Sequence, residues 1–373
     1  MSNNSFCISY PQVYLSTDKS QINFMTGTPD LVSIFKPGEN NSERRFFVTD
    51  ATVASLPCML PFISKFEDDK CGNDCLIILG SGEPYKTIDS VLRIVTGAIE
   101  ADFSRNDVFV GIGGGVICDI TAFAASIFKR GANVEFVPTT LLAMVDASIG
   151  GKTGCDFANY KNMIGAFYPA RQLYYWPEFI QSLPENQFNS GLAEAFKTGI
   201  LFDTELFDLF EKSSEKILSR ESEILDIIIK KCVAAKAKIV EEDFTEKGIR
   251  CYLNLGHTYG HAFETLAGLG AVTHGQAVAW GIGRAVSLSH IKGYCLESFK
   301  NRILDTMKLY NWEISALPSA IKGGAIGERF LTVMHKDKKN MSSSVKIIMP
   351  KAICDIVSEE VSDSDILLSL KDN

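Results

Sequence analysis

The first half of the chain alternates short apolar runs with stretches of helical periodicity. Residues 45–48, 76–79, 108–111 and 134–137 predict strands, and the last three each open into a turn containing glycine, proline or threonine. Helical stretches lie between these runs, as in βαβ units. The pattern therefore predicts an α/β domain built on a parallel sheet.

From about residue 184 the helical period dominates. It predicts helices at 204–218, 222–242, 257–266, 275–290 and 296–310, and only residues 345–349 have the pattern of a strand. We expect an α/β domain of residues 1–182 followed by a mainly helical domain of residues 183–373.

Composition excludes several classes of protein. With 373 residues and a net charge of −8, the chain has ample core but a poor charge balance for binding nucleic acid. The apolar stretch 53–63 is interrupted by Ser55, Pro57 and Pro61 and falls short of the ~20 residues that span a bilayer. The N-terminal residues lack the pattern of a signal peptide, and the ten cysteines are scattered. We expect a cytoplasmic protein with reduced thiols and no membrane or nucleic-acid partner.

A glycine-rich turn follows one predicted strand. Residues 107–112 run into Gly113, Gly114 and Gly115, and a helical stretch then continues to about residue 129. Consecutive glycines let backbone N–H groups approach a pyrophosphate at a helix N-terminus. The same turn also occurs in proteins that bind no nucleotide, so a purely structural turn stays open. Glu83 and Lys86, in the turn after another strand, and Asp50 at a third strand end favour a dinucleotide site.

Histidines gather in one part of the second half. His257 and His261 lie one helical turn apart, His274 follows, and Glu194 offers a carboxylate upstream. Two or three imidazoles with a carboxylate are typical of a catalytic Zn²⁺ site with an open position. Ordinary capping or surface histidines are the alternative.

Basic residues stand beside glycines or within apolar helical segments of this acidic chain. Together they indicate a pocket for a small polyanionic substrate, although each alone fits a solvated side chain. They are Arg130, Lys152, Lys161, Lys197, Lys236, Arg250 and Lys338 or Lys339.

A series of long motifs resembles the 3-dehydroquinate synthases of the sugar phosphate cyclase superfamily. The first half contributes Gly113-Gly-Gly-Val-Ile-Cys-Asp119, Val137-Pro-Thr-Thr-Leu-Leu-Ala-Met-Val-Asp146 and Lys161-Asn-Met-Ile-Gly-Ala-Phe167. The second half contributes Gly191-Leu-Ala-Glu-Ala-Phe-Lys197, Leu253-Asn-Leu-Gly-His-Thr-Tyr-Gly-His261 and His274-Gly-Gln-Ala-Val278. The motifs occur in the family's order and cover roughly residues 45 to 350.

The resemblance implies an NAD- and metal-dependent carbon–oxygen lyase of the shikimate pathway of aromatic amino acid biosynthesis. Such an enzyme converts 3-deoxy-D-arabino-heptulosonate 7-phosphate, a small phosphorylated keto acid, to 3-dehydroquinate and phosphate. The steps are transient oxidation by NAD, β-elimination, re-reduction and intramolecular aldol closure. The implied fold is an α/β N-terminal dinucleotide-binding domain with a mostly α-helical C-terminal metal-binding domain, and the implied assembly is a homodimer.

Residue by residue, the resemblance assigns three roles. The metal ligands would be Glu194, His257 and His274, and either Zn²⁺ or Co²⁺ suits them. The NAD site would comprise Asp50, Glu83, Lys86, Gly114, Gly115, Val116, Asp119, Thr139, Thr140, Asp146, Lys152, Lys161, Phe179 and Ser182. The substrate contacts would comprise Arg130, Lys152, Asn162, Lys197, Lys236, Arg250, Asn254, His261 and one of Lys338 and Lys339.

The identity of the substrate depends on a carboxylate. Lys236 and Arg250 stand where the family binds one, which favours the heptulosonate over the substrate of a sedoheptulose 7-phosphate cyclase, which has no carboxylate. Cys118 replaces the usual glycine and Gln276 the usual glutamate, so an aminodehydroquinate synthase stays open. A metal- and NAD-dependent polyol dehydrogenase of the glycerol dehydrogenase type is a further alternative.

Overall fold

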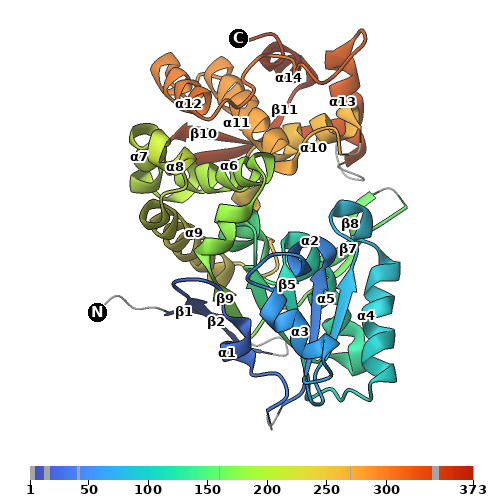
Figure 1. Ribbon diagram of the computed structural model, residues 1–373. Coiled ribbons are helices and arrows are strands. Elements are labelled where there is room, and N and C mark those ends of the chain that lie inside the picture. Colours follow the sequence, from blue (N-terminus) through green and yellow to red (C-terminus); the bar gives the residue numbers. More distant parts are fainter. Residues whose placement is uncertain are drawn as a thin grey trace. The chain divides into compact units, whose positions relative to one another are not determined.

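The computed structural model describes residues 5–11, 17–39, 43–158, 160–268, 270–337 and 344–372. The chain divides into two compact units (Figure 1). The first comprises Met1–Leu183 and Lys236–Thr245, and the second comprises Pro184–Ala235 and Glu246–Asn373. The segment Lys236–Thr245 therefore belongs to the first unit although it interrupts the sequence of the second. No helix among the described residues is long and apolar enough to cross a bilayer.

The first unit is an α/β domain. Its strands are β1 (Ser5–Ser9), β2 (Lys19–Phe24), β3 (Arg45–Asp50), β4 (Cys75–Leu79), β5 (Val108–Gly113), β6 (Asn133–Pro138), β7 (Lys152–Phe157), β8 (Tyr160–Phe167) and β9 (Gln172–Tyr175). Its helical segments are α1 (Leu31–Phe35), α2 (Ala51–Ala54), α3 (Leu60–Glu67), η1 (Glu83–Tyr85), α4 (Ile88–Glu100), α5 (Gly115–Ile127), η2 (Phe128–Arg130), the π-helix η3 (Ala143–Ala147) and η4 (Pro177–Ser182).

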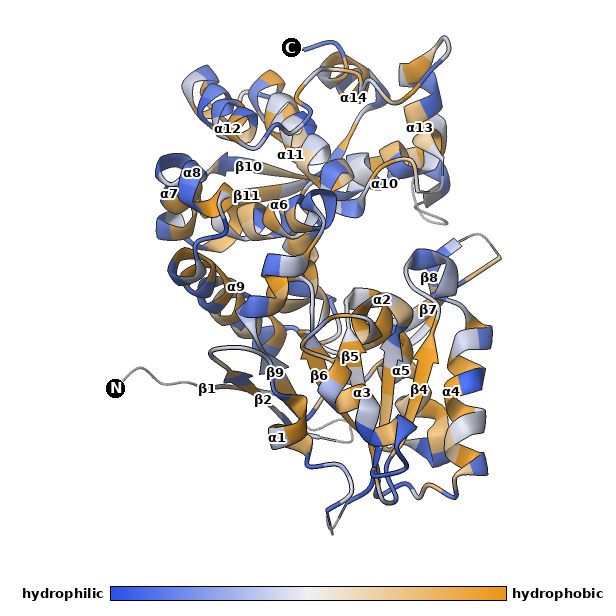
Figure 2. Cartoon of the chain, viewed as in Figure 1, coloured by the Kyte–Doolittle hydropathy of each residue, from blue (hydrophilic) through white to orange (hydrophobic). Residues whose placement is uncertain are grey.

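Seven of the described strands form one sheet in the order β1-β2-β9-β6-β5-β3-β4. All neighbours from β2 to β4 pair in parallel, and only β1 is antiparallel. The central strand β5 is buried along its whole length, as expected for a parallel strand covered on both faces. Figure 2 shows the corresponding hydrophobic colour along β4, β5 and β6. The four strands predicted from apolar runs are β3, β4, β5 and β6, so the predicted parallel sheet is confirmed.

The second unit is mainly helical. It contains α6 (Glu185–Phe202), α7 (Thr204–Lys212), α8 (Ser214–Leu218), most of α9 (Ser222–Glu242), η5 (Ile249–Asn254), α10 (His257–Ala267), α11 (His274–Ile291), α12 (Glu297–Leu309), α13 (Ile326–Asp337) and α14 (Asp363–Ser369). One antiparallel hairpin, β10 (Val345–Ala352) with β11 (Asp355–Val361), completes it.

Helix α11 is the central element of this unit. Nearly all of its side chains are buried, and Trp280 packs against Tyr259, Phe263 and Phe330. Helix α10 approaches it so closely that a Cβ on Gly281 would lie 2.0 Å from the carbonyl oxygen of Gly256. The contact between these two helices therefore requires glycine.

Two predictions for the second unit are wrong in detail. The stretch 204–218 is two helices, because Ser213 leaves helical geometry and caps the second one. The strand β11 was not predicted: its sequence, Asp355-Ile-Val-Ser-Glu-Glu-Val361, carries too many polar residues for a buried run and forms a strand by pairing with β10.

Candidate active site

The glycine-rich turn joins β5 to α5 in the first unit. Gly114 is the N-cap of α5, and a Cβ there would lie 3.0 Å from Thr140. A Cβ on Gly113 would lie 2.6 Å from Ile117. The first turn of a helix leaves backbone N–H groups without an intrahelical partner, and those of α5 carry the partial positive charge of the helix end. This cradle, formed without side chains, fits a pyrophosphate group.

Other predicted cofactor residues lie at the same edge of the sheet. Asp50 ends β3, and its carboxylate accepts hydrogen bonds from the backbone N–H of Thr52 at 2.9 Å and from the Ser81 hydroxyl at 2.9 Å. Thr139 and Thr140 directly follow β6. Because β3, β5 and β6 are parallel, their carboxyl ends lie side by side, the usual place for a ligand in such a sheet.

Lys86 links the turn after β4 to two other elements. Its buried ammonium lies 2.6 Å from the Asp119 carboxylate on α5 and donates to Asn162 Oδ1 at 2.6 Å. Asn162, on β8, adopts a positive φ of 53°, and its backbone N–H donates a further hydrogen bond to the Asp156 carboxylate at 2.8 Å. The structure thus joins two predicted cofactor residues with a predicted substrate residue.

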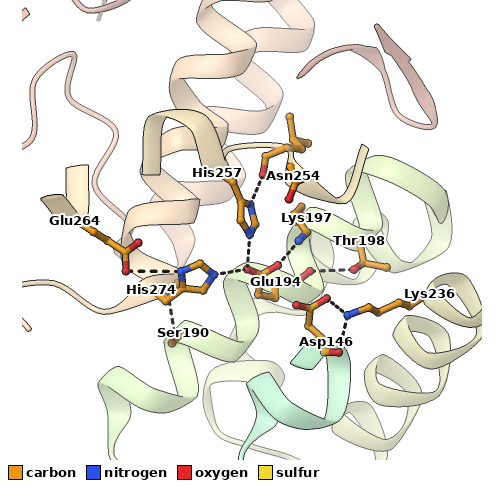
Figure 3. A network of polar contacts seen from close by, with 12 residues as sticks. Asp146, Ser190, Glu194, Lys197, Thr198, Lys236, Asn254, His257, Glu264 and His274 are labelled. Atoms are coloured by element: carbon orange, nitrogen blue, oxygen red, sulfur yellow. Dashed lines mark hydrogen bonds and ion pairs between the residues drawn. The ribbon is translucent and has the colours of Figure 1, made fainter. Parts of the chain in front are cut away.

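Lys236 is bound to the π-helix η3. Its ammonium donates to the Asp146 backbone carbonyl at 2.6 Å and to the Asp146 carboxylate at 2.5 Å (Figure 3). A π-helical turn costs regular hydrogen bonding and is common at functional sites. This contact, the hydrogen bond from Ser9 to Glu241 and the packing of Phe244 on Tyr10 and Phe167 join residues Lys236–Thr245 to the first unit.

The remaining predicted residues of the first unit lie as follows. Lys161 on β8 is 3.7 Å from Glu83, and Lys152 begins β7. Phe179 and Ser182 lie in η4, with Phe179 buried. Arg130 is exposed at the end of η2, with a positive φ of 68°. Gly115 and Val116 begin α5.

The second unit brings the three predicted metal ligands together. Glu194 comes from the buried middle of α6, His257 begins α10 and His274 begins α11. The Nε2 atoms of His257 and His274 lie 3.7 and 3.2 Å from Glu194 Oε1, and Lys197 Nζ lies 2.5 Å from Oε2 (Figure 3). All three can offer one ligand atom within 4.8 Å of each other.

The combined effects of burial and neighbouring groups lower the pKa values of Glu194 and His257 and raise that of His274. Burial would raise the pKa of Glu194, but Lys197 and the two histidines hold that pKa well below its usual range. Burial and the charge of Lys197 lower the pKa of His257 to about 3. Burial alone would lower the pKa of His274, but the neighbouring carboxylates of Glu194 and Glu264 raise that pKa to about 9.

The donor set fits a divalent metal ion. Glu194 is buried; Lys197 Nζ lies against its Oε2, and Oε1 faces the Nε2 atoms of His257 and His274. A carboxylate oxygen and two imidazole nitrogens that converge in this way are ligand types that Zn²⁺ takes in proteins. Three protein ligands of this kind are typical of catalytic sites that keep one coordination position open.

The other predicted residues of this unit lie in α10, in η5 or outside the described residues. His261 follows His257 on α10, with ring centroids 5.4 Å apart. Arg250 is buried in η5, and Asn254 donates to Glu246 at 2.8 Å. Lys338 and Lys339 lie outside the described residues.

The structure explains the roles of Gln276 and Glu264. Gln276, where the family usually has glutamate, closes a capping box at the start of α11: its side chain accepts from the Thr273 backbone at 2.8 Å. Glutamine can do this as well as glutamate. Glu264, to which sequence reasoning gave no role, faces His274; its position one turn after His261 was the available signal.

Two comparisons match this chain to a single family. Models of the N-terminal and C-terminal parts of 3-dehydroquinate synthase match residues 76–190 and 191–340. The 3-dehydroquinate synthase of Pelobacter propionicus is 39% identical over 78% of this chain and 80% of its own. That of Methylococcus capsulatus is 35% identical over 92% of both chains.

Solved structures agree on the fold. The 2-epi-5-epi-valiolone synthase of Streptomyces hygroscopicus, solved with NAD⁺ and Zn²⁺, matches with a TM-score of 0.80 and 25% identity over 94% of this chain and 95% of its own. A 2-deoxy-scyllo-inosose synthase matches with a TM-score of 0.81 at 21% identity over 98% and 99%. The predicted fold class is thereby confirmed. With both family models covering most of the sequence and relatives well above 30% identity over most of their length, the chain belongs to the 3-dehydroquinate synthase family.

Proposed function

We propose that this chain is a 3-dehydroquinate synthase, an NAD- and metal-dependent lyase that converts 3-deoxy-D-arabino-heptulosonate 7-phosphate to 3-dehydroquinate and phosphate. The observation that carries the proposal is the convergence of Glu194, His257 and His274 in a chain 35–39% identical to enzymes of that name. The reaction places the chain in the shikimate pathway.

The first unit supplies the cofactor residues. NAD⁺ bound there would accept a hydride from a substrate hydroxyl carbon and return it later in the same turnover. The glycines at the start of α5 and the strand-end residues Asp50, Thr139 and Thr140 would hold its pyrophosphate and riboses. The 2-epi-5-epi-valiolone synthase and the 2-deoxy-scyllo-inosose synthase, which are similar to this chain, were both solved with NAD⁺ bound.

The second unit supplies the metal ligands. Zn²⁺ or Co²⁺ held by Glu194, His257 and His274 would act as a Lewis acid on a substrate oxygen. Lys197 lies against Glu194 and limits the negative charge of the ligand set. His261, one turn from His257, is placed to orient a substrate hydroxyl by hydrogen bonding.

Basic residues would hold the two anionic ends of the substrate. We assign the carboxylate to Lys236 and Arg250, and further substrate contacts to Arg130, Lys152, Asn162 and Lys197. Asn254 and one of Lys338 and Lys339 complete the assignment. Held in this way, the phosphate can act as its own base in the elimination, so positioning matters more than a separate protein base.

The location and assembly are part of the same proposal. All ten cysteines are free thiols, which supports a cytoplasmic protein in a reducing compartment. Family membership supports a homodimer, and light scattering of the purified protein would measure its mass.

Phosphate release provides the direct test. The protein with NAD⁺ and Zn²⁺ or Co²⁺ should release phosphate from the heptulosonate phosphate, without net NADH, and release none from sedoheptulose 7-phosphate. Activity on the second sugar alone would favour another cyclase. Net NADH formation from a polyol would favour a dehydrogenase. This chain is similar to solved glycerol dehydrogenases with TM-scores of 0.61–0.64, a likeness that shows the fold alone.

A pair of variants tests the carboxylate assignment. Lys236→Met should raise KM for the heptulosonate phosphate by at least tenfold, because a charge-assisted hydrogen bond contributes about 1.5–3 kcal/mol. Lys238→Met, an exposed position two residues along the same helix, is the control and should leave KM unchanged. Equal KM values in the two variants would contradict the assignment.

A further inference from the structure

His257 and His274 both direct Nε2 at Glu194, but their Nδ1 atoms have different kinds of partner. A histidine that binds a metal through one ring nitrogen normally uses the other to contact a carbonyl or carboxylate, which fixes the orientation of the ring. His257 Nδ1 lies 3.2 Å from the backbone carbonyl oxygen of Leu255. The main chain therefore orients His257, and no side-chain substitution can remove that acceptor.

His274 relies on a side chain instead. Its Nε2 faces Glu194 Oε1 at 3.2 Å, while its Nδ1 faces Glu264 Oε1 at 3.7 Å (Figure 3). Glu264 belongs to α10 and His274 begins α11, so the contact crosses between two helices. The Glu264 side chain is 11% exposed and that of His274 is 32% exposed, so water screens this contact only in part.

We propose that Glu264 is a positioning residue that fixes the His274 ring with Nε2 directed at the metal and makes the imidazole a stronger ligand. The inference rests on the proposed metal site at Glu194, His257 and His274. A carboxylate behind the ring both sets the tautomer and raises the basicity of the opposite nitrogen. Glu264 itself stays outside the coordination sphere.

The same residues allow a competing arrangement. His261, Glu264 and His274 can also offer three ligand atoms within 4.8 Å of each other. In that arrangement His261, Glu264 and His274 would all bind the metal ion directly. The two arrangements differ in what His261 does: it is a ligand in the second and irrelevant to metal affinity in the first.

Metal affinity without substrate separates these roles. Metal-free protein is titrated with Co²⁺ against a competing chelator, and the visible absorption of the bound Co²⁺ is recorded. Glu264→Ala should weaken binding about 10–100-fold, the usual cost of losing such a partner, and alter the Co²⁺ spectrum. Glu264→Gln keeps an acceptor oxygen without the charge, so its affinity should fall between those of the wild type and the alanine variant.

Two controls define the outcome. Thr265→Ala changes the next residue of α10, whose hydroxyl only donates to the His261 backbone, and should bind Co²⁺ like the wild type. Urea unfolding in EDTA checks that each variant is folded, and the isosteric Glu264→Gln serves if the alanine variant is not. His261→Ala should also keep wild-type affinity.

Wild-type affinity and an unchanged spectrum in both Glu264 variants would overturn the inference. A loss in His261→Ala as large as that in Glu264→Ala would overturn it in favour of the competing arrangement. Absence of Co²⁺ binding by the wild-type protein would instead overturn the proposed function, and the inference with it.

Discussion

Substituting Gly281 by alanine should separate α10 from α11 and disturb the proposed metal ligands His257 and His274. The new Cβ would lie 2.0 Å from the Gly256 carbonyl oxygen and 3.0 Å from the Gly260 nitrogen. Non-bonded heavy atoms settle at about 3.5 Å or more. Both neighbours are backbone atoms and cannot rotate away, so the helices must move apart by more than about 1 Å.

Gly283 provides a matched control on the same helix. A Cβ there would meet only the flexible ends of Met307 at 3.4 Å and Leu304 at 3.5 Å, which are ordinary contacts. Replacing glycine by alanine inside a helix stabilises it by about 1 kcal/mol, and both variants share this gain. The difference between the two variants therefore isolates the overpacking cost, about 1–3 kcal/mol.

The assay has a stability arm and a metal arm. Hydrogen exchange of peptides from α10 and α11, in EDTA, should show weaker protection in Gly281→Ala than in Gly283→Ala by that amount. Gly256 directly precedes His257, and active-site geometry tolerates about 0.5 Å, so Gly281→Ala should also lose at least tenfold in Co²⁺ affinity. Equal protection and equal affinity in the two variants would refute the close crossing of these helices.

Three further predictions concern other contacts. Lys86→Met leaves the partly buried Asp119 carboxylate without its 2.6 Å partner and should destabilise the first unit by about 3 kcal/mol in urea unfolding. The double variant Lys86→Met/Asp119→Asn should recover part of this loss, and no recovery would contradict the pairing. Arg284, fully buried, donates to the carbonyls of Ser369, Asp372 and Ile314, so Arg284→Met should release the C-terminal residues from α11, seen as faster proteolysis there. Hydrogen bonding to Arg302 lowers the pKa of Glu211, so this contact stabilises above the unfolded pKa of about 4.3 and is lost as pH falls below it. Wild-type protein should therefore lose more stability between pH 6 and pH 3 than Arg302→Met.

Sustained periodicity made the long elements predictable. The stretch 222–242 was predicted with the same limits as α9, and the four apolar runs of the first half are strands of the sheet. Short elements without a buried apolar face were not predictable. The hairpin β7–β8 is mostly exposed, and β11 is only partly buried and carries three acidic residues, so neither shows the pattern of a buried strand.

Sequence spacing also could not show which imidazole nitrogens converge. His257 and His261 lie on one helical face, so spacing alone made them equally good ligands. In the folded unit the choice depends on what stands behind each ring: the Leu255 carbonyl holds Nδ1 of His257, and its Nε2 then faces Glu194. Glu194 and Leu255 belong to different elements, α6 and the turn before α10, which only the packing of the second unit brings together. The proposed ligand set is thus a property of tertiary structure, whereas the residue types that form it can be read from the sequence.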